Sequence, residues 1–362
     1  MKVHVPADYP TIQAAVDAAP DGATIEIAAG TWPAAVTIAG RTGLRLTGKD
    51  AVLDGGGGPG VAIDQCEGIA LTGLTLRNCS SHCLSVSKSK WILLSKCRIE
   101  DALLDGAVLF QCTGVGFSRC SFERCANYGI RESDSTSVVV SKCAFRTIGD
   151  KAISLSEYGS PGPSGSAIVG NTISGVNNYG ILIGASGVVV AKNVLSDIAL
   201  AGITCDTSGT PEGTRIVKNL IRDTGEQGVI LGGVDSLAEK NTVSDTGGAG
   251  IELRGENQAA VGNRIARAAG PGIHARGVGP NRVEKNRIDG AADGILMETS
   301  GGAILGNKVA GAAEYGIHVF GTGITIDRNT ALGIWGDLRD HHAAGVNSYG
   351  RNKFGTAFFG DK

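Results

Sequence analysis

The chain has 362 residues, of which 42% are hydrophobic, and its 33 Lys and Arg residues nearly balance its 35 Asp and Glu residues. This composition excludes a disordered chain, and the lack of a basic excess disfavours a nucleic-acid partner held by phosphate contacts. The 56 glycines follow no three-residue period, which excludes a collagen. No apolar stretch is long enough to cross a membrane, so we expect no membrane partner either.

The N-terminus lacks a charged stretch followed by an apolar one, so no signal peptide is visible. We therefore expect a cytoplasmic protein, or a secreted or periplasmic one from which a leader has been removed. Residues 8–20 are predicted to form a short amphipathic helix with Ile12, Ala15 and Val16 on one face. Such a helix would cover the open first coil of a repeat protein, so residues 1–23 are predicted to be an N-terminal cap.

A repeat of 21 to 28 residues, most often 22 or 23, runs through most of the chain and is carried by two columns. One of the two columns is a Gly-Ile pair, as at residues 129–130 and 250–251. Short alternating runs between Gly and Asn indicate strands separated by turns. The repeat is too short for paired helices or propeller blades, which favours a coil of three short parallel strands per repeat. The other column, here called the asparagine column, consists of Cys97, Cys120, Cys143, Asn171, Asn193, Asn219, Asn241, Asn263, Asn286, Asn307 and Asn329.

The sequence therefore predicts an all-β protein, a single-stranded parallel β-helix of about 12 coils. We expect one domain over residues 1–362, because the period does not stop within the repeats. Coils are predicted over 24–336, and the segment 337–362, where the repeat is lost, is predicted to cap the other end. The asparagine column is interpreted as structural, since Asn tolerates a left-handed bend and stacked amides bond to one another.

These repeats resemble those of right-handed parallel β-helix proteins of the pectin-lyase-like superfamily, and are similar to the NosD and mannuronan C5-epimerase type. The resemblance covers nearly the whole chain. It implies that the first strand of each coil, called PB1, and its flanking turns carry the active groove. By this analogy the Gly-Ile strands are PB1, and the asparagine column lies in the turn between the second and third strands.

Two groups of ionisable side chains occupy the outward PB1 positions and the position before each Gly-Ile pair. The first cluster consists of His82, Asp105, Tyr128, Arg131, Lys151 and Tyr179. The second cluster consists of Glu252, Arg254, His274, Arg276, Glu298 and His318. Neighbours in a column lie about 4.8 Å apart, so Tyr128, Lys151 and Tyr179 are expected to form one short row. The charges of the second cluster can equally be read as cross-strand pairs on a solvated face.

Two coils are longer than the others, through insertions at residues 156–166 and 206–213 just after PB1. Insertions in a solenoid collect on one face, often the binding face, and these would rise beside the first cluster. We therefore assign catalysis to the first cluster. The second cluster is assigned to substrate binding, together with Glu157, Tyr158 and Asp206.

The resemblance implies a polysaccharide or oligosaccharide partner, and Tyr, His, Lys and Arg serve in alginate lyases and epimerases of this fold. Removing the C5 proton of a uronate needs a cation beside the sugar carboxylate, a base and an acid. Arg131 and Lys151 suit the cationic role, or Lys151 could be the base. Tyr128, Tyr179 or His82 could form the acid–base pair. Elimination would make the protein a lyase, and reprotonation from the other face would make it a C5-epimerase.

Two alternatives stay open, because the DPHD-like motif of secreted alginate epimerases and the motif sets of polygalacturonases and pectin esterases are absent. The first is an inverting glycoside hydrolase, which needs two carboxylates about 6.5–9.5 Å apart. Asp105 with Asp150, or Glu252 with Glu298, could meet this spacing. The second is a non-catalytic carbohydrate-binding or structural β-helix. We expect no cofactor and no metal, since no coil shows the Asp cluster that gives pectate lyases their calcium, and the oligomeric state is left open.

Overall fold

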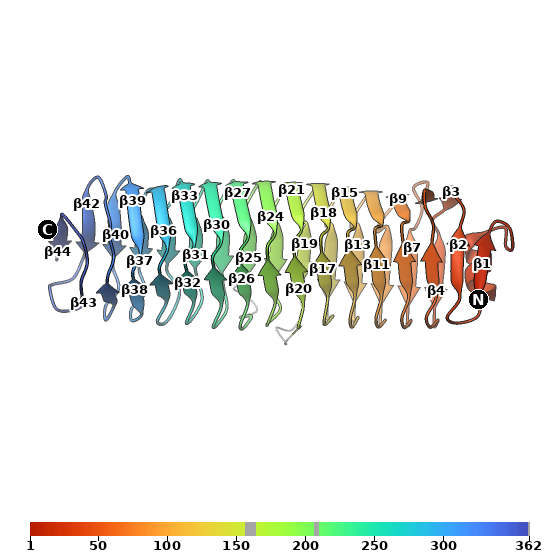
Figure 1. The fold of residues 1–362 in the computed structure, drawn as a ribbon, viewed down its shortest axis with the longest axis horizontal. Coiled ribbons are helices and arrows are strands. Elements are labelled where there is room, and N and C mark those ends of the chain that lie inside the picture. Colours follow the sequence, from red (N-terminus) through yellow and green to blue (C-terminus); the bar gives the residue numbers. More distant parts are fainter. Residues whose placement is uncertain (156–163, 206–209, 361–362) are drawn as a thin grey trace. The chain divides into compact units, whose positions relative to one another are not determined.

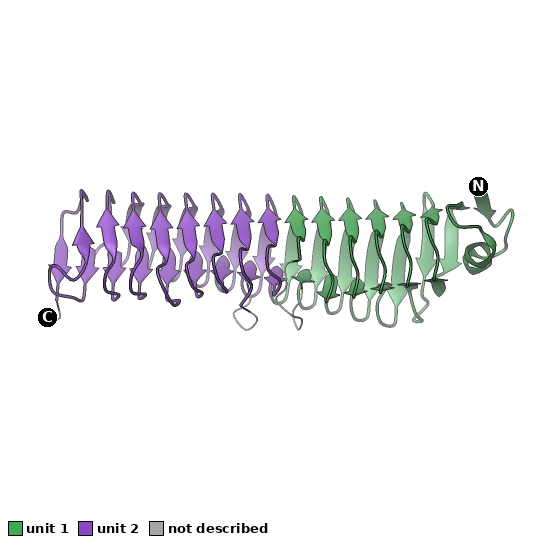
Figure 2. Ribbon diagram, turned by 90° about the horizontal axis from the view of Figure 1, so that it is seen from below, with its two compact units in different colours: residues 1–178 green, residues 179–362 purple. Residues whose placement is uncertain are grey.

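The computed structural model describes residues 1–155, 164–205 and 210–360. The chain divides into two compact units, unit 1 over Met1–Asn178 and unit 2 over Tyr179–Lys362 (Figure 2). Within each unit, successive turns of the chain place their strands in three sheets, here named A, B and C (Figure 1). In each sheet, a strand pairs in parallel with the strand of the next turn. The predicted all-β parallel β-helix is thereby confirmed, and the expectation of a single domain stays a prediction.

Unit 1 contributes strands to all three sheets. Its sheet A consists of β1 (Lys2–Val5), β2 (Thr24–Ile27), β5 (Arg45–Thr47), β8 (Ala70–Thr72), β11 (Leu93–Ser95), β14 (Gly116–Ser118), β17 (Val139–Ser141) and β20 (Ala167–Val169). Its sheet B consists of β3 (Gly30–Pro33), β6 (Ala51–Asp54), β9 (Thr75–Cys79), β12 (Arg98–Ala102), β15 (Ser121–Cys125), β18 (Ala144–Ile148) and β21 (Thr172–Val176). Its sheet C, which holds the Gly-Ile strands, consists of β4 (Val36–Ala39), β7 (Val61–Asp64), β10 (Leu84–Ser87), β13 (Ala107–Phe110), β16 (Ile130–Ser133) and β19 (Ile153–Leu155).

Unit 2 is built in the same way. Its sheet A consists of β23 (Val189–Ala191), β26 (Arg215–Val217), β29 (Leu237–Glu239), β32 (Ala259–Val261), β35 (Arg282–Glu284), β38 (Ala303–Leu305), β41 (Thr325–Asp327) and β43 (Ser348–Tyr349). Its sheet B consists of β24 (Val194–Ile198), β27 (Leu220–Thr224), β30 (Thr242–Thr246), β33 (Arg264–Ala268), β36 (Arg287–Ala291) and β39 (Lys308–Ala312). Its sheet C consists of β22 (Ile181–Ile183), β25 (Ile203–Cys205), β28 (Val229–Leu231), β31 (Ile251–Leu253), β34 (Ile273–Ala275), β37 (Ile295–Met297), β40 (Tyr315–Val319), β42 (Gly336–Asp340) and β44 (Ala357–Phe359).

The number of coils is larger than predicted. In the described residues, sheet C has six strands in unit 1 and nine in unit 2, so the chain makes about 15 turns rather than about 12. The additional strands lie near both ends of the chain, and β42 still pairs in register with β40 on one side and β44 on the other. Backbone hydrogen bonds between parallel strands need no particular side chain, so coils form where no repeat is visible.

The single helix of the described residues is α1 (Ile12–Ala18), shorter than the predicted segment. It begins where the Thr11 side chain accepts a hydrogen bond from the Ala14 amide at 3.1 Å, an N-cap that satisfies one unpaired donor. Its Ile12, Ala15 and Val16 are buried as predicted, and it contacts β1, β2 and β4. In the described part of the chain, no helix has the length and apolar character that crossing a membrane would require.

The asparagine column forms a buried ladder of side-chain amides between sheets A and B. In unit 2, Oδ1 of Asn263 accepts from the backbone and side-chain nitrogens of Asn241 at 2.9 and 3.0 Å. Its Nδ2 donates to the carbonyl of Ala238 and to Oδ1 of Asn286 at 2.9 and 3.0 Å. Each amide therefore satisfies buried polar groups in the turn before and the turn after its own. Cysteines take this column in part of unit 1, and all nine cysteines are buried.

The Gly-Ile column has a steric cause. The glycine before each Gly-Ile strand lies against the backbone of the next turn, and a methyl group at Gly250 would lie 2.7 Å from the carbonyl oxygen of Gly272. The same methyl group would lie 2.5 Å from Cγ2 of Ile265. Both distances are well below normal contact, so a Cβ at Gly250 would push the neighbouring coil away.

Replacing Gly250 with alanine is therefore expected to lower the free energy of unfolding by about 1–3 kcal/mol, the usual cost of overpacking. Chemical unfolding of the purified protein measures this change. Gly116→Ala is the matched control, because a methyl group there would meet only Cδ1 of the exposed Leu93 side chain, at 3.2 Å. Equal stability of the Gly250 variant and the wild-type protein would contradict the steric explanation.

Candidate functional site

Asp105 is the centre of the first cluster. It precedes β13 at the edge of sheet C and is fully buried. Its Oδ1 accepts hydrogen bonds from Nδ2 of Asn127 at 2.9 Å and from the amide of Tyr128 at 3.1 Å. Its Oδ2 accepts from Nε of Arg131 at 2.9 Å and lies 3.3 Å from Nδ1 of His82. One buried carboxylate thus ties together side chains from three successive turns.

The charge on Asp105 is maintained by these neighbours. Burial by itself would raise the pKa of Asp105, but the close His82 imidazole, the Tyr128 amide and the charge of Arg131 outweigh it. The pKa of this carboxyl group therefore lies below its ordinary value. At neutral pH Asp105 is an anion that orients Arg131, and it cannot serve as a proton donor.

Replacing Asp105 with asparagine is expected to destabilise the protein at about pH 7 much more than at about pH 3. The folded pKa is lower than the unfolded one, so the carboxylate stabilises the fold fully above the ordinary value of about 4. That contribution disappears as the pH falls through the folded pKa, where the wild-type side chain also becomes neutral. Urea unfolding at the two pH values measures the difference.

The control for this measurement is Asp134→Asn, because Asp134 is exposed and its side chain makes no hydrogen bond or ion pair with any described residue. We expect this variant to follow the wild-type protein at both pH values. An Asp105 variant that loses the same stability in acid as at neutral pH would show that its ionised form does not stabilise the fold.

Tyr128 and Lys151 form a buried pair next to Asp105. Tyr128 is 7% exposed and Lys151 is 6% exposed. Nζ of Lys151 donates to the phenolic oxygen of Tyr128 at 3.3 Å and to Oδ2 of Asp150 at 3.0 Å. The same ammonium lies 4.9 Å from the centre of the Tyr128 ring. The predicted neighbourhood of Tyr128 and Lys151 is present, and it places a positive charge beside a phenol.

Arg131 is the part of the first cluster that is open to a ligand. Its side chain is 33% exposed, and Cζ lies 5.7 Å from the centre of the Tyr128 ring. Only Nε is engaged, on Asp105, so its two terminal nitrogens make no hydrogen bond with any described residue. A guanidinium held at Nε in this way presents two donors to an anion, and the geometry suits a carboxylate.

The second cluster separates into smaller groups. Glu252 is buried, and its Oε2 accepts from Nη2 of Arg254 at 3.0 Å while Nε of Arg276 contacts its Oε1. Burial would raise the pKa of Glu252, but the two guanidinium groups outweigh it and hold the pKa below its usual value. His274 pairs separately with Glu298, Nε2 to Oε2, at 3.0 Å. The contacts of Glu252 with Arg276 and of His274 with Glu298 join neighbouring turns, as the alternative interpretation expects, whereas Arg254 lies on the same turn as Glu252.

All of these catalytic and binding assignments stay predictions. Tyr179 belongs to unit 2, where it is half-buried two residues before β22. Glu157, Tyr158 and Asp206 lie outside the described residues.

His318 has partners that the sequence interpretation missed. Its Nδ1 lies 3.0 Å from Oδ2 of Asp293, and its Nε2 lies 3.0 Å from Nε2 of His341. The signal was present in the column before the Gly-Ile pairs, where Asp293 is followed by Tyr315 22 residues later. Asp105 is followed by its own tyrosine 23 residues later, so the spacing alone could have linked the two aspartates.

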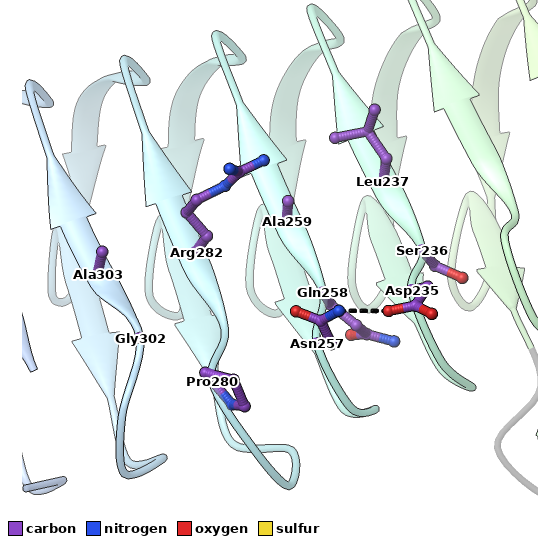
Figure 3. A pocket seen from close by; sticks show the side chains of 10 residues that line it. All are labelled: Asp235, Ser236, Leu237, Asn257, Gln258, Ala259, Pro280, Arg282, Gly302 and Ala303. Atoms are coloured by element: carbon purple, nitrogen blue, oxygen red, sulfur yellow. Dashed lines mark hydrogen bonds between the residues drawn. The ribbon is translucent and has the colours of Figure 1, made fainter. Parts of the chain in front are cut away.

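A hollow of about 500 Å³ on sheet A of unit 2 offers less chemistry (Figure 3). Its lining includes one hydrogen-bonded pair, Asn257 with Asp235, and a single cation, Arg282, on β35. It lies on a different sheet from the Gly-Ile strands, and its lining contains no histidine, tyrosine or cysteine. In the parts of the chain that the structure describes, no group of three or more His, Cys, Asp or Glu side chains could hold a metal ion.

The sequence matches one family of known proteins, described as "Right handed beta helix region", over residues 59–212 and 201–354. No curated protein sequence is similar enough to this chain to count as a relative.

Several solved structures share the fold. The A-module of a mannuronan C-5 epimerase from Azotobacter vinelandii is 15% identical, with a TM-score of 0.57 over 88% of this chain and 93% of that one. The tailspike protein of E. coli bacteriophage HK620, solved with a pentasaccharide, is 12% identical, with a TM-score of 0.62 over 93% and 73%. The surface adhesin PfbA of Streptococcus pneumoniae is 13% identical, with a TM-score of 0.59 over 87% and 86%. At these identities the likeness concerns the fold.

Proposed function

This chain belongs to the right-handed β-helix family, of the pectin-lyase-like type, and from that premise we propose that it abstracts the C5 proton of a uronate in an acidic polysaccharide. The observation that carries the proposal is the state of Arg131, whose Nε is held by a buried aspartate while its terminal nitrogens have no described partner. The two terminal nitrogens form a fork of donors that binds a carboxylate in a fixed orientation beside Tyr128.

The chemistry follows from the residues around that fork. A base takes the proton from C5, and the electron pair left behind spreads into the sugar carboxylate, where Arg131 stabilises the growing negative charge. Tyr128 and His82 are the proton-transferring groups, on turns either side of Asp105. The Lys151 ammonium, 3.3 Å from the phenolic oxygen, stabilises negative charge on Tyr128. Reprotonation of C5 from the opposite face completes an epimerisation, and loss of the C4 oxygen completes an elimination.

The pKa values of two carboxyl groups restrict the roles that they could take in an inverting hydrolase. That mechanism needs one carboxyl group that is protonated at neutral pH and one that is not. Asp105 and Glu252, a member of each candidate pair, have pKa values below the ordinary range because of the groups around them. Each suits only the general base, so this alternative would need Asp150 or Glu298 as the general acid. The enzymes and saccharide complexes among proteins of this fold support a carbohydrate ligand, since one is named as a mannuronan epimerase and another holds a pentasaccharide.

The experiment is a comparison of polymannuronate, polygalacturonate and a neutral glucan as substrates for the full chain. An elimination gives ultraviolet absorbance from the new double bond, and an epimerisation gives deuterium at C5 in heavy water without shortening the polymer. We expect one of these two signals with a polyuronate and neither with the glucan. Reducing ends without either signal would overturn the proposal in favour of hydrolysis. A shift in melting temperature with no reaction would overturn it in favour of a binding protein.

A further inference from the structure

Asp293 in unit 2 repeats the surroundings of Asp105 with a histidine in place of the arginine. Its Oδ1 accepts from the amide of Tyr315 at 3.0 Å, and its Oδ2 lies 3.0 Å from Nδ1 of His318. Asp293 is 6% exposed, so this carboxylate is also buried at the start of a sheet C strand. The second copy differs chemically, because an imidazole can both donate and accept a hydrogen bond whereas a guanidinium only donates.

A line of hydrogen bonds continues from Asp293 through His318 to His341, the residue directly after β42. Nε2 of His318 lies 3.0 Å from Nε2 of His341, and the two rings stack with centres 5.2 Å apart. A carboxylate oxygen accepts hydrogen bonds, so the contact with Asp293 assigns a hydrogen to Nδ1 of His318, and one of the two Nε2 atoms then donates to the other. The buried carboxylate thereby fixes the orientation of both imidazoles.

Two aromatic side chains, Phe320 and Tyr315, adjoin the imidazoles, and Trp335 adjoins Tyr315. The Phe320 ring centre lies 4.0 Å from that of His341 and 4.6 Å from that of His318. The Tyr315 ring lies 4.7 Å from His318 and 5.8 Å from Trp335. Trp335 is 59% exposed and Phe320 is 42% exposed, which leaves two large ring surfaces open to solvent. The apolar CH face of a pyranose covers such rings while its hydroxyl groups bond to polar neighbours.

Arg339 adds a positive charge to this group. On β42 it is the register partner of His318 on β40, and both side chains are half-buried. Its guanidinium makes no hydrogen bond or ion pair with any residue that the structure describes. An unengaged guanidinium beside exposed rings favours a sugar that carries a carboxylate over a neutral one.

We propose that these side chains form a second saccharide site, in unit 2, for a pyranose that carries a carboxylate. The site, here called the ring site, consists of Asp293, Tyr315, His318, Phe320, Trp335, Arg339 and His341. It shares no residue with the first cluster and needs no reaction there. Its ligand belongs to the class proposed for the substrate, so the choice of ligand rests on the proposed function.

The test is the binding of a mannuronate hexasaccharide to the full chain, followed by calorimetry and tryptophan fluorescence. Titrations are made in the Arg131→Gln background, which weakens the other proposed site. Trp335→Ala and Arg339→Gln are each expected to weaken binding by at least about tenfold. The matched control is Trp91→Ala, which removes an equally exposed tryptophan (60%) from unit 1 and should leave the affinity unchanged. Melting temperatures show that each variant is folded.

Wild-type affinity in either ring-site variant would overturn the proposal, and so would equal binding of maltohexaose, a neutral hexasaccharide. The two proposals fail separately. Binding that depends on Trp335 in a chain that transforms no polyuronate would support the ring site and contradict the proposed reaction. Full turnover of polyuronate with no binding through Trp335 would support the reaction and contradict the ring site.

Discussion

Replacing Arg131 with glutamine is expected to lower the turnover of polyuronate by about a hundredfold to a thousandfold. The variant keeps a polar side chain but loses the charge that faces the sugar carboxylate and the ion pair to Asp105, 2.9 Å long in the wild-type protein. Because the charge on the substrate grows as the C5 proton leaves, kcat should fall more than KM rises. Initial rates, read by whichever signal the wild-type protein gives, measure the effect.

The control is Arg146→Gln, since Arg146 lies exposed on β18 of the same unit and makes no hydrogen bond or ion pair with any described residue. Its rate should equal that of the wild-type protein. Arg131→Lys keeps the charge without the fork, so we expect a rate between those of the wild-type protein and the glutamine variant. Equal losses in the Arg131 and Arg146 variants would reveal a general effect of charge on the polymer, and the assignment of the site would then be wrong.

Replacing Asn263 with alanine is expected to lower the free energy of unfolding by about 2–4 kcal/mol. The amide is fully buried and takes part in four hydrogen bonds, two to Asn241 and one each to Ala238 and Asn286. Alanine leaves the buried amide of Asn241 and the carbonyl of Ala238 with fewer partners, and it leaves a cavity. Urea unfolding, followed by circular dichroism, measures the loss.

The control for the ladder is Asn177→Ala, because Asn177 is exposed and its side chain makes no hydrogen bond with any described residue. Its stability should change by less than about 0.5 kcal/mol. If Asn263→Ala is as stable as Asn177→Ala, the ladder does not stabilise the coils and the column has another explanation.

The sequence indicated which residues lie near one another in the first cluster, and it said less about the hydrogen bonds between them. Spacing placed Tyr128 beside Lys151 on neighbouring turns, and the structure has their side chains in contact. The spacing did not predict that Asp105 is buried and binds several side chains, because spacing does not show which of the polar neighbours a carboxylate bonds to. Asp293 was overlooked for the same reason, although it stands in the same column.

The sequence by itself determined the coil, its repeat and the ladder. In a solenoid the neighbours of a residue are the residues one repeat away, so a column such as Asn241, Asn263 and Asn286 in the sequence is also a column in space. Tertiary structure alone decided that Arg131 turns its Nε to Asp105 and that His318 joins His341. Side-chain direction depends on rotamers and on every competing partner in adjacent turns, which spacing does not record. The additional coils at the ends were also decided by the tertiary structure alone, because their strands are held by backbone hydrogen bonds that leave no pattern in the side chains.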